Sequence, residues 1–251
     1  MPRRGGYSPP SCHPDTPLEN ALGNFVLALP MLLAAMVIHE YAHARVALAQ
    51  GDDTAYMLGR VTLNPIPHID LWMSILLPVM LWFGSAGRFT FGGAKPVPVN
   101  PRKYRNYRKG DILVSAAGVA ANFLMALAAA SAFVLVGLLG DAVPGMASAL
   151  DPVQRMLTWG VWLNILICFF NLIPLPPLDG SHIFYHLLPP ELGARYRGLQ
   201  RFGFLPLMAI LIFLPQVTSI LLTPAFAMLN WLTGLMAPYQ LDTGLRIFSS
   251  S

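Results

Sequence analysis

The chain has 251 residues, of which 55% are hydrophobic and only 11% are charged, and its mean hydropathy is +0.55. Soluble domains carry about 25% charged residues, so this composition excludes an ordinary soluble protein and predicts an all-α polytopic membrane protein. The formal net charge of +4 comes from basic residues in loops between apolar segments, which indicates membrane orientation and argues against nucleic-acid binding.

The chain begins with a polar segment, residues 1–20, which is rich in Pro, Gly and Ser and shows no apolar periodicity. We expect it to be a short flexible leader. A signal peptide is excluded because the apolar run that follows is too long and lacks a clear cleavage pattern. Residues 21–240 are expected to form one membrane-embedded domain, and residues 241–251 a C-terminal tail.

A metal-binding motif lies inside the first apolar segment, residues 22–49, which has no charged residue before Glu40. His39, Glu40 and His43 form H-E-x-x-H, and with six His and three Glu in the chain a chance match has a probability of roughly 0.002. Helix positions four apart share one face, so both imidazoles can reach one metal ion. Glu40 then stands beside the metal, where it can polarise a bound water. The pattern predicts an intramembrane zinc site.

The depth of Glu40 in the apolar segment favours a functional role. A carboxylate at membrane depth costs about 2.5–3.5 kcal/mol on insertion scales, and such residues usually mark function. The alternative is a His/Glu cluster at the membrane interface that only packs against its neighbours.

Two short pieces that follow this segment have strand-like sequences, residues 59–65 and 93–100. Pro96 and Pro98 exclude a central strand for the second piece but allow an edge strand. An unpaired edge near the metal would accept an extended peptide by strand addition, which suits a protease because a helical substrate has to be unwound before cleavage. An ordinary cytoplasmic loop is the open alternative.

Further apolar segments bring the expected number of membrane helices to about four to six. Residues 112–139 and 156–172 are clear spans, and small residues in the first of them allow close helix approach. Residues 71–83 are apolar but short and are interrupted by Pro78, which fits a re-entrant hairpin as well as a span. Residues 202–236 are long enough for one full span plus a second membrane helix.

Loop charges predict the orientation of these helices. Five Lys and Arg residues lie within residues 102–109, whereas residues 140–152 contain two Asp but no Lys or Arg. The positive-inside rule places the first loop in the cytoplasm and the second outside. By the same path, the N-terminus lies outside and His43 lies toward the cytoplasmic end of its helix.

A third constellation is the proline-rich run that ends in Asp179-Gly180, residues 171–180. Its three prolines break the helix where the third span approaches the cytoplasmic side. Non-helical backbone at this depth is tolerated only inside protein or along a watery cavity, which suits a metal ligand. A catalytic zinc typically has three protein ligands and one open position, so Asp179 is the candidate third ligand. On its own, Asp-Gly would be interpreted as a turn.

Other polar residues offer competing sites. His182 and His186 are also four apart and close to Asp179, so they are a rival metal face, although no Glu lies between them. His68 is better suited to supporting its loop or a ligand. Asn164, in the third span, is expected to hydrogen-bond another helix.

The order of these motifs resembles the site-2-protease family of intramembrane zinc metalloproteases, particularly its compact members without an inserted PDZ domain. The resemblance covers roughly residues 37–180 and is carried by residues 39–43, 51–55, 59–65, 94–101, 117–122 and 171–180. It implies that His39, His43 and Asp179 bind one zinc ion per chain and that Glu40 is the general base.

The resemblance also implies that Asn122 and Asn171 line the site and hold the substrate backbone or the oxyanion. One departure from the family pattern is Val119, which stands where the family usually has Pro after Ala-Gly. This change affects the expected bend of the helix there but removes no ligand and no acid or base.

Together these features predict an intramembrane zinc metalloendopeptidase that hydrolyses a peptide bond in or near a substrate's transmembrane helix, as in regulated intramembrane proteolysis. The expected partners are a membrane-spanning protein substrate and the lipid bilayer, in the plasma (inner) membrane, with the active site toward the cytoplasmic side. The oligomeric state is open. The alternative function is a metal-ion carrier or transporter that uses the same polar site, although that function does not account for Glu40 at the general-base position.

Overall fold

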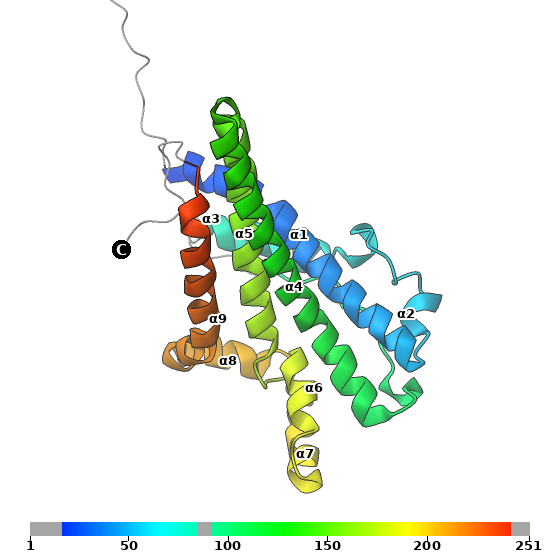
Figure 1. Ribbon diagram of the computed structural model, residues 1–251. Helices are drawn as coiled ribbons and strands as arrows, with labels where there is room; N and C mark the ends of the chain where they lie inside the picture. Colours follow the sequence, from blue (N-terminus) through cyan, green and yellow to red (C-terminus); the bar gives the residue numbers. More distant parts are fainter. Residues whose placement is uncertain (1–16, 85–91, 242–251) are drawn as a thin grey trace, which may run out of the picture.

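The computed structural model describes residues 17–84 and 92–241, and these residues are mostly helical (Figure 1). Among them, four helices are long and apolar enough to cross a membrane. These helices are α1 (Pro17–Gln50), α4 (Tyr107–Ala142), α5 (Ala147–Asn171) and α9 (Pro215–Met236). The prediction of an all-α polytopic membrane protein is therefore confirmed. Most of the predicted leader and C-terminal tail lies outside the described residues, although α1 begins at Pro17 within the predicted leader.

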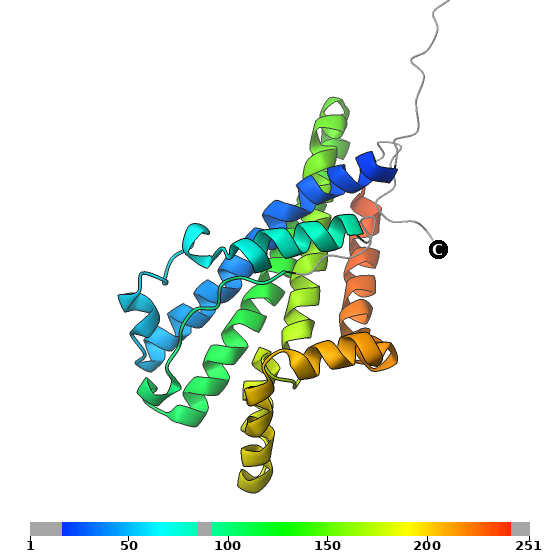
Figure 2. The same ribbon diagram turned by 180° about the vertical axis from the view of Figure 1, so that it is seen from behind.

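The shorter helical elements lie in the connections between the long helices. They are α2 (Thr54–Met57), η1 (Ile66–His68), η2 (Leu71–Leu76), α3 (Leu77–Gly84), η3 (Pro101–Lys103), η4 (Pro144–Met146), α6 (Asp179–Tyr185), α7 (Pro190–Arg197), η5 (Gly198–Phe202), α8 (Leu205–Phe213) and η6 (Ala237–Tyr239). Figure 2 shows α6 and α7 projecting beyond the long helices, at the end where α4 begins.

The central helix of the bundle is α4, which packs against α1, α5 and α9. Its C-terminal half shares a buried apolar cluster with α5 and α9, in which Phe133, Ile165 and Leu229 are almost fully buried. Small residues let the helices approach, because a side-chain carbon at Gly160 would lie 2.4 Å from the Met31 methyl group. Close packing of this kind holds membrane helices together where the hydrophobic effect cannot.

The opposite end of α4 is tied to the end of α1. The Arg105 backbone N–H donates to the Gln50 carbonyl at 2.8 Å, and the Asn106 side chain caps α4 by accepting from the Lys109 N–H at 3.0 Å. The basic loop before α4 and the C-terminal end of α1 therefore lie at the same end of the bundle. At this end, the hydrogen bond from Lys103 Nζ lowers the pKa of the exposed Asp53 carboxyl.

The apolar piece at residues 71–83 forms a short continuous helix, η2 followed by α3. It packs on α1 and α5 through Trp82, whose ring lies 6.0 Å from Phe25 and 5.5 Å from Trp159. Residues 92–100 run back past the start of this helix, where Ser74 Oγ donates a hydrogen bond to the Gly93 carbonyl at 2.7 Å. Within the described residues this is one helix with an extended return, and residues 85–91 between them lie outside the description.

The strand-like pieces do not form a β-strand anywhere in the described residues, which corrects that part of the prediction. Residues 92–100 lack regular structure because Pro96 and Pro98 have no N–H to contribute to a ladder. Single hydrogen bonds hold this segment instead, from the Lys95 N–H to the His68 carbonyl at 2.8 Å and from the Asn100 N–H to Asp52 at 2.5 Å.

The apolar region at residues 202–236 is divided into α8 and α9, which confirms the expected span with a second helix. The break falls at Leu214, whose backbone is non-helical (φ −129°, ψ 59°), and Pro215 begins α9. Proline at a first helical position lacks only an N–H that would be unpaired in any case. In Figure 1, α8 runs across the lower end of α9.

Candidate metal centre

His39 and His43 lie on one face of α1, about one turn apart, with their Nε2 atoms 2.9 Å from each other. This geometry follows from their spacing of four in a helix. Both rings are directed toward α4, and the His39 side chain is buried. The two histidines of the motif are thus brought to one point inside the helical bundle.

Asp179 lies at the same point, although it is far from His39 and His43 in the sequence. It is the first residue of α6, directly after the proline-rich loop that ends α5. Its Oδ2 atom lies 3.2 Å from His39 Nε2 and 3.3 Å from His43 Nε2. Among the described residues, these three form the one group whose ligand atoms all lie within 4.8 Å of one another.

Tight backbone packing at Gly180 sets the direction in which α6 leaves the loop. A side-chain carbon at Gly180 would lie 2.3 Å from the Leu172 carbonyl oxygen, so only glycine fits there. Ile173 and Leu178 anchor the loop by packing against Leu207 of α8. The loop and its anchors therefore place the Asp179 carboxylate beside α1.

Hydrogen bonds at the Nδ1 atoms determine which atoms of the histidines face the centre. His43 Nδ1 lies 2.7 Å from the Val114 carbonyl, which can only accept, so Nδ1 carries the hydrogen. In the neutral ring, the Nε2 lone pair is then directed at the centre. Metal-bound histidines typically donate their other ring N–H to a carbonyl or carboxylate in this way.

His39 is held by an amide network in the same manner. Its Nδ1 lies 2.6 Å from Asn122 Oδ1, while Asn122 Nδ2 donates to the Ala35 carbonyl at 3.2 Å and to Asn164 Oδ1 at 2.8 Å. Because the Ala35 carbonyl can only accept, the NH₂ group of Asn122 must face it. Asn122 Oδ1 is therefore left to accept a hydrogen bond from His39 Nδ1. Asn122 and Asn164 are both fully buried, and Asn164 makes the interhelical bond expected of it.

The three converging atoms fit a zinc ion. Zinc bonds of about 2.0–2.2 Å in a tetrahedron place ligand atoms about 3.3–3.6 Å apart, close to the distances between Asp179 Oδ2 and the two Nε2 atoms. The two Nε2 atoms are closer to each other, at 2.9 Å, so the rings have to move slightly apart to hold the ion. Asp179 Oδ2 is buried without a hydrogen-bond partner among the described residues. Two imidazole lone pairs and a carboxylate oxygen that face one another are a donor set that suits a bound cation.

Close approach of α4 completes the centre. A side-chain carbon at Gly118 would lie 2.5 Å from His43 Nε2 and 2.7 Å from His39 Nε2. Glycine here therefore leaves the space in which the ligand atoms meet. The sequence motif contained Gly118, but its role depends on which face of α4 meets α1, and the sequence alone does not show this.

Glu40, the predicted general base, is held by the extended segment. Its Oε2 atom accepts from the Val97 backbone N–H at 2.7 Å, and the side chain is partly buried. Residues 92–100, predicted to lie near the metal, therefore run beside the motif. The contact with the Val97 backbone carries no side-chain signal and was not predicted.

The remaining candidates are not part of the group formed by His39, His43 and Asp179. Asn171, the last residue of α5, is half-buried and donates from Nδ2 to the Ile167 carbonyl at 3.0 Å. His182 and His186 pair with Asp111 instead of meeting each other at a metal. His68 is buried in its loop, with Nε2 2.9 Å from the Thr62 carbonyl.

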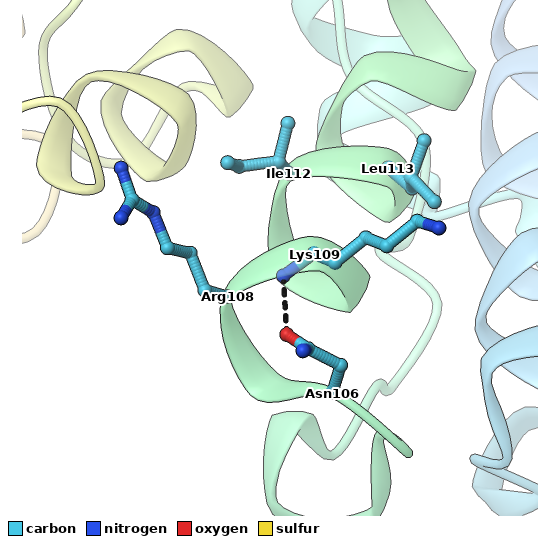
Figure 3. Close-up of a pocket in the computed structure, with 5 residues that line it drawn as sticks. All are labelled: Asn106, Arg108, Lys109, Ile112 and Leu113. Carbon is cyan, nitrogen blue, oxygen red and sulfur yellow. Dashed lines mark hydrogen bonds between the residues drawn. The ribbon is translucent and has the colours of Figure 1, made fainter.

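A shallow pocket lies at the start of α4 (Figure 3). It is lined by Asn106, Arg108, Lys109, Ile112 and Leu113. None of the proposed ligands contributes to this pocket.

Comparisons with known proteins point to one family. The profile of Peptidase family M50 matches residues 27–210, which include every proposed ligand. The chain is 38% identical over 194 residues to "Putative zinc metalloprotease YwhC" of Bacillus subtilis (strain 168), covering 77% of this chain and 82% of that protein. It is 29% identical over 196 residues to "Putative zinc metalloprotease Rip2" of Mycolicibacterium smegmatis, covering 76% of this chain and 68% of that protein. No solved structure matches the chain significantly.

The family match covers most of the chain and includes H-E-x-x-H, the Asn122 helix and the Asp179 loop. On these grounds the chain belongs to peptidase family M50, the site-2-protease family that its motifs resemble.

Proposed function

We propose that this chain is an intramembrane zinc metalloendopeptidase that hydrolyses a peptide bond within or beside a substrate's transmembrane helix. The observation that carries the proposal is the meeting of His39 Nε2, His43 Nε2 and Asp179 Oδ2 inside a bundle of apolar helices. The names of the relatives support a zinc metalloprotease. They do not favour a metal carrier, which also leaves Glu40 without a role.

The proposed chemistry divides between the metal and Glu40. Zinc, when bound by His39, His43 and Asp179, supplies Lewis-acid activation by lowering the pKa of a water to about 7 and polarising a carbonyl group. A Glu40 carboxylate oxygen takes a proton from the attacking water and returns a proton to the leaving amine nitrogen. The Val97 N–H holds Oε2 and so orients the carboxylate for this transfer.

Asn122 and Asn171 are assigned different roles in the site. The hydrogen bonds of Asn122 support a positioning role for the His39 ring, since its amide is fully buried and engaged on both sides. Asn171 is half-buried at the end of α5 and is the proposed contact to the substrate backbone. The assignment of both residues stays a prediction.

The substrate is proposed to bind in an extended form beside residues 92–100. The Lys95 and Val97 N–H groups are used within the protein, and Pro96 and Pro98 have none. The segment therefore offers mainly carbonyl oxygens, which would accept from the N–H groups of an unwound peptide. Residues 92–100 lie beside Glu40, where cleavage is proposed.

The extent of the membrane domain and its orientation in the membrane are also proposed. We propose that residues 21–240 act as one membrane-embedded domain in the plasma (inner) membrane, with the metal centre toward the cytoplasmic side. The support is that the basic residues of the 102–109 loop lie at the same end of the bundle as the C-terminal half of α1, where His43 lies.

Quantitative proteomics of membranes tests the function even where the substrate has not been identified. Membranes carrying wild-type protein are compared with membranes carrying Glu40→Gln, and Glu191→Gln, an exposed position on α7, is the matched control. We expect membrane-spanning proteins to accumulate uncut only with Glu40→Gln. The same set of cleaved fragments in all three samples would contradict the proposal.

A further inference from the structure

A second polar cluster joins α4 to α6 near the metal centre. His186 Nε2 lies 2.8 Å from Asp111 Oδ2, and both side chains are buried, with exposed fractions of 5% and 6%. His182 Nδ1 lies 3.4 Å from Asp111 Oδ1 and is more exposed. We propose that Asp111 is a positioning residue that, mainly through His186, holds α6 against α4 and so keeps Asp179 at the metal centre. This inference rests on the proposed metal site.

The polar cluster and the metal centre lie on the same face of α4, one above the other along the helix. Asp111 and Gly118 are seven residues apart on α4, which puts them on one face about 10 Å apart. Asp179, the first residue of α6, and His186, the residue that caps its C-terminal end, have the same spacing. The two helices thus meet at two points, with Asp179 at the metal centre and His186 at Asp111.

The short helix α6 needs this second point of attachment. It has seven residues, which is too few for a helix to be stable without tertiary contacts. Two neighbours of Asp111 add to the attachment at His186. Arg108 Nη2 donates to the His186 carbonyl at 2.8 Å, and the Tyr107 ring packs edge-on against the His186 ring at 5.5 Å. Figure 3 shows the Arg108 side chain directed away from α4 toward the neighbouring helix.

The cluster is better explained by attachment than by a second metal. In the described part of the chain, no group of three ligands other than His39, His43 and Asp179 brings its atoms within 4.8 Å of one another. Each carboxylate oxygen of Asp111 instead faces a different histidine. A buried carboxylate that accepts a hydrogen bond from the His186 ring and lies beside the His182 ring fixes the distance between two helices, which is the role proposed here.

A double-mutant cycle on the purified full-length protein tests the coupling. Zinc dissociation constants are measured by chelator competition for wild type, Asp111→Asn, Asp179→Asn and the double variant. Asp111→Asn should weaken zinc binding about tenfold, as loss of a ligand-orienting contact does. In the Asp179→Asn background the same change should have no further effect, because Asp111 acts through Asp179. Equal losses in both backgrounds, or no loss in the single variant, would overturn the inference.

Further variants separate positioning from general destabilisation. Asp151→Asn, which removes a carboxylate paired with Arg155 on α5, is the control and should bind zinc as wild type does. His186→Gln keeps an N–H donor and should stay within about threefold of wild type, whereas His186→Leu should match Asp111→Asn. The visible spectrum of the Co²⁺-substituted protein should change with His186→Leu but not with His186→Gln.

These variants also decide the inference if Asp111→Asn does not fold. Wild-type affinity in His186→Leu would then overturn it. A wild-type protein that binds no zinc would instead contradict the proposed function.

Discussion

Single residues behind the ligands determine whether His39 and His43 can bind a metal. Each ring is held at Nδ1, one by Asn122 and the other by the Val114 carbonyl, and both arrangements leave Nε2 directed at Asp179. Such contacts fix the tautomer and the ring orientation, and their loss typically lowers metal affinity 10–100-fold.

We expect Asn122→Leu to weaken zinc binding by about 10–100-fold, because His39 Nδ1 loses its acceptor. Asn122→Asp keeps an acceptor and should recover most of the affinity. Asn230→Leu, at an exposed position of α9, is the matched control for the substitution itself. Competition with a zinc chelator measures all three. Unchanged zinc affinity with a raised KM in Asn122→Leu would instead favour the substrate contact that the family resemblance implies.

Gly118→Ala should also lower zinc affinity, because the added carbon would lie 2.5 Å from His43 Nε2. The helix itself should tolerate alanine, which is the better helix former by about 1 kcal/mol. Gly234→Ala on α9 meets no atom within 4 Å and should leave zinc content unchanged. Metal analysis of the two purified variants tests this, and equal zinc content in both would show that the ligand atoms do not need the space at Gly118.

At the residue scale, the sequence reveals side chains but not backbone partners. The spacing of His39 and His43 predicts that they share a helix face, and the structure brings Asp179 to the same point. Their role as ligands stays a prediction. The Val114 carbonyl and the Val97 N–H carry no residue-type signal, so only the packing of α4 and of residues 92–100 against α1 reveals them.

The elements that matter most for the site are the proline-rich loop and the short helix α6 that follows it. Ile173 and Leu178 bury the loop against α8, and Gly180 allows α6 to start directly beside the Leu172 carbonyl. The position of Asp179 therefore depends on the fold of the loop, whereas the shared helix face of His39 and His43 follows from helical geometry alone.

Gly180→Ala should displace Asp179, since the added carbon would lie 2.3 Å from the Leu172 carbonyl oxygen. Overpacking of this kind destabilises by about 1–3 kcal/mol. We expect a lower melting temperature together with weaker zinc binding, measured by thermal unfolding in detergent with and without added zinc. Gly198→Ala, which meets no atom within 4 Å, serves as the control. Zinc affinity at the wild-type level in Gly180→Ala would show that the loop tolerates the shift.

Long helices were easier to predict than connections. Their apolar length specifies α1, α4, α5 and α9 without tertiary information. The sequence leaves residues 92–100 open between an edge strand and a loop. In the structure they form a loop, in which single side-chain and backbone contacts take the place of a partner strand. The link between α4 and α6 through Asp111 was also missed, because the two helices are far apart in the sequence.

At the scale of the whole molecule, orientation in the membrane determines which side the metal centre faces. Substituted cysteines test it. In a Cys12→Ser background, in which Cys168 is buried, Gly145→Cys should react with an impermeant maleimide in intact cells. Arg102→Cys should react only after permeabilisation, since the positive-inside rule places its loop in the cytoplasm. The reverse labelling pattern would place the metal centre toward the outer side.

In the proposed site, His39, His43 and Asp179 bind zinc while Glu40 transfers protons. The most direct test measures zinc stoichiometry and hydrolysis of a labelled transmembrane peptide on the same purified preparations of wild type, Glu40→Gln and Glu191→Gln. All three should contain about one zinc per chain, and hydrolysis should fall by about 10²–10⁴-fold in Glu40→Gln alone. Full hydrolysis by Glu40→Gln, or wild-type protein that cleaves the peptide without zinc, would contradict the account.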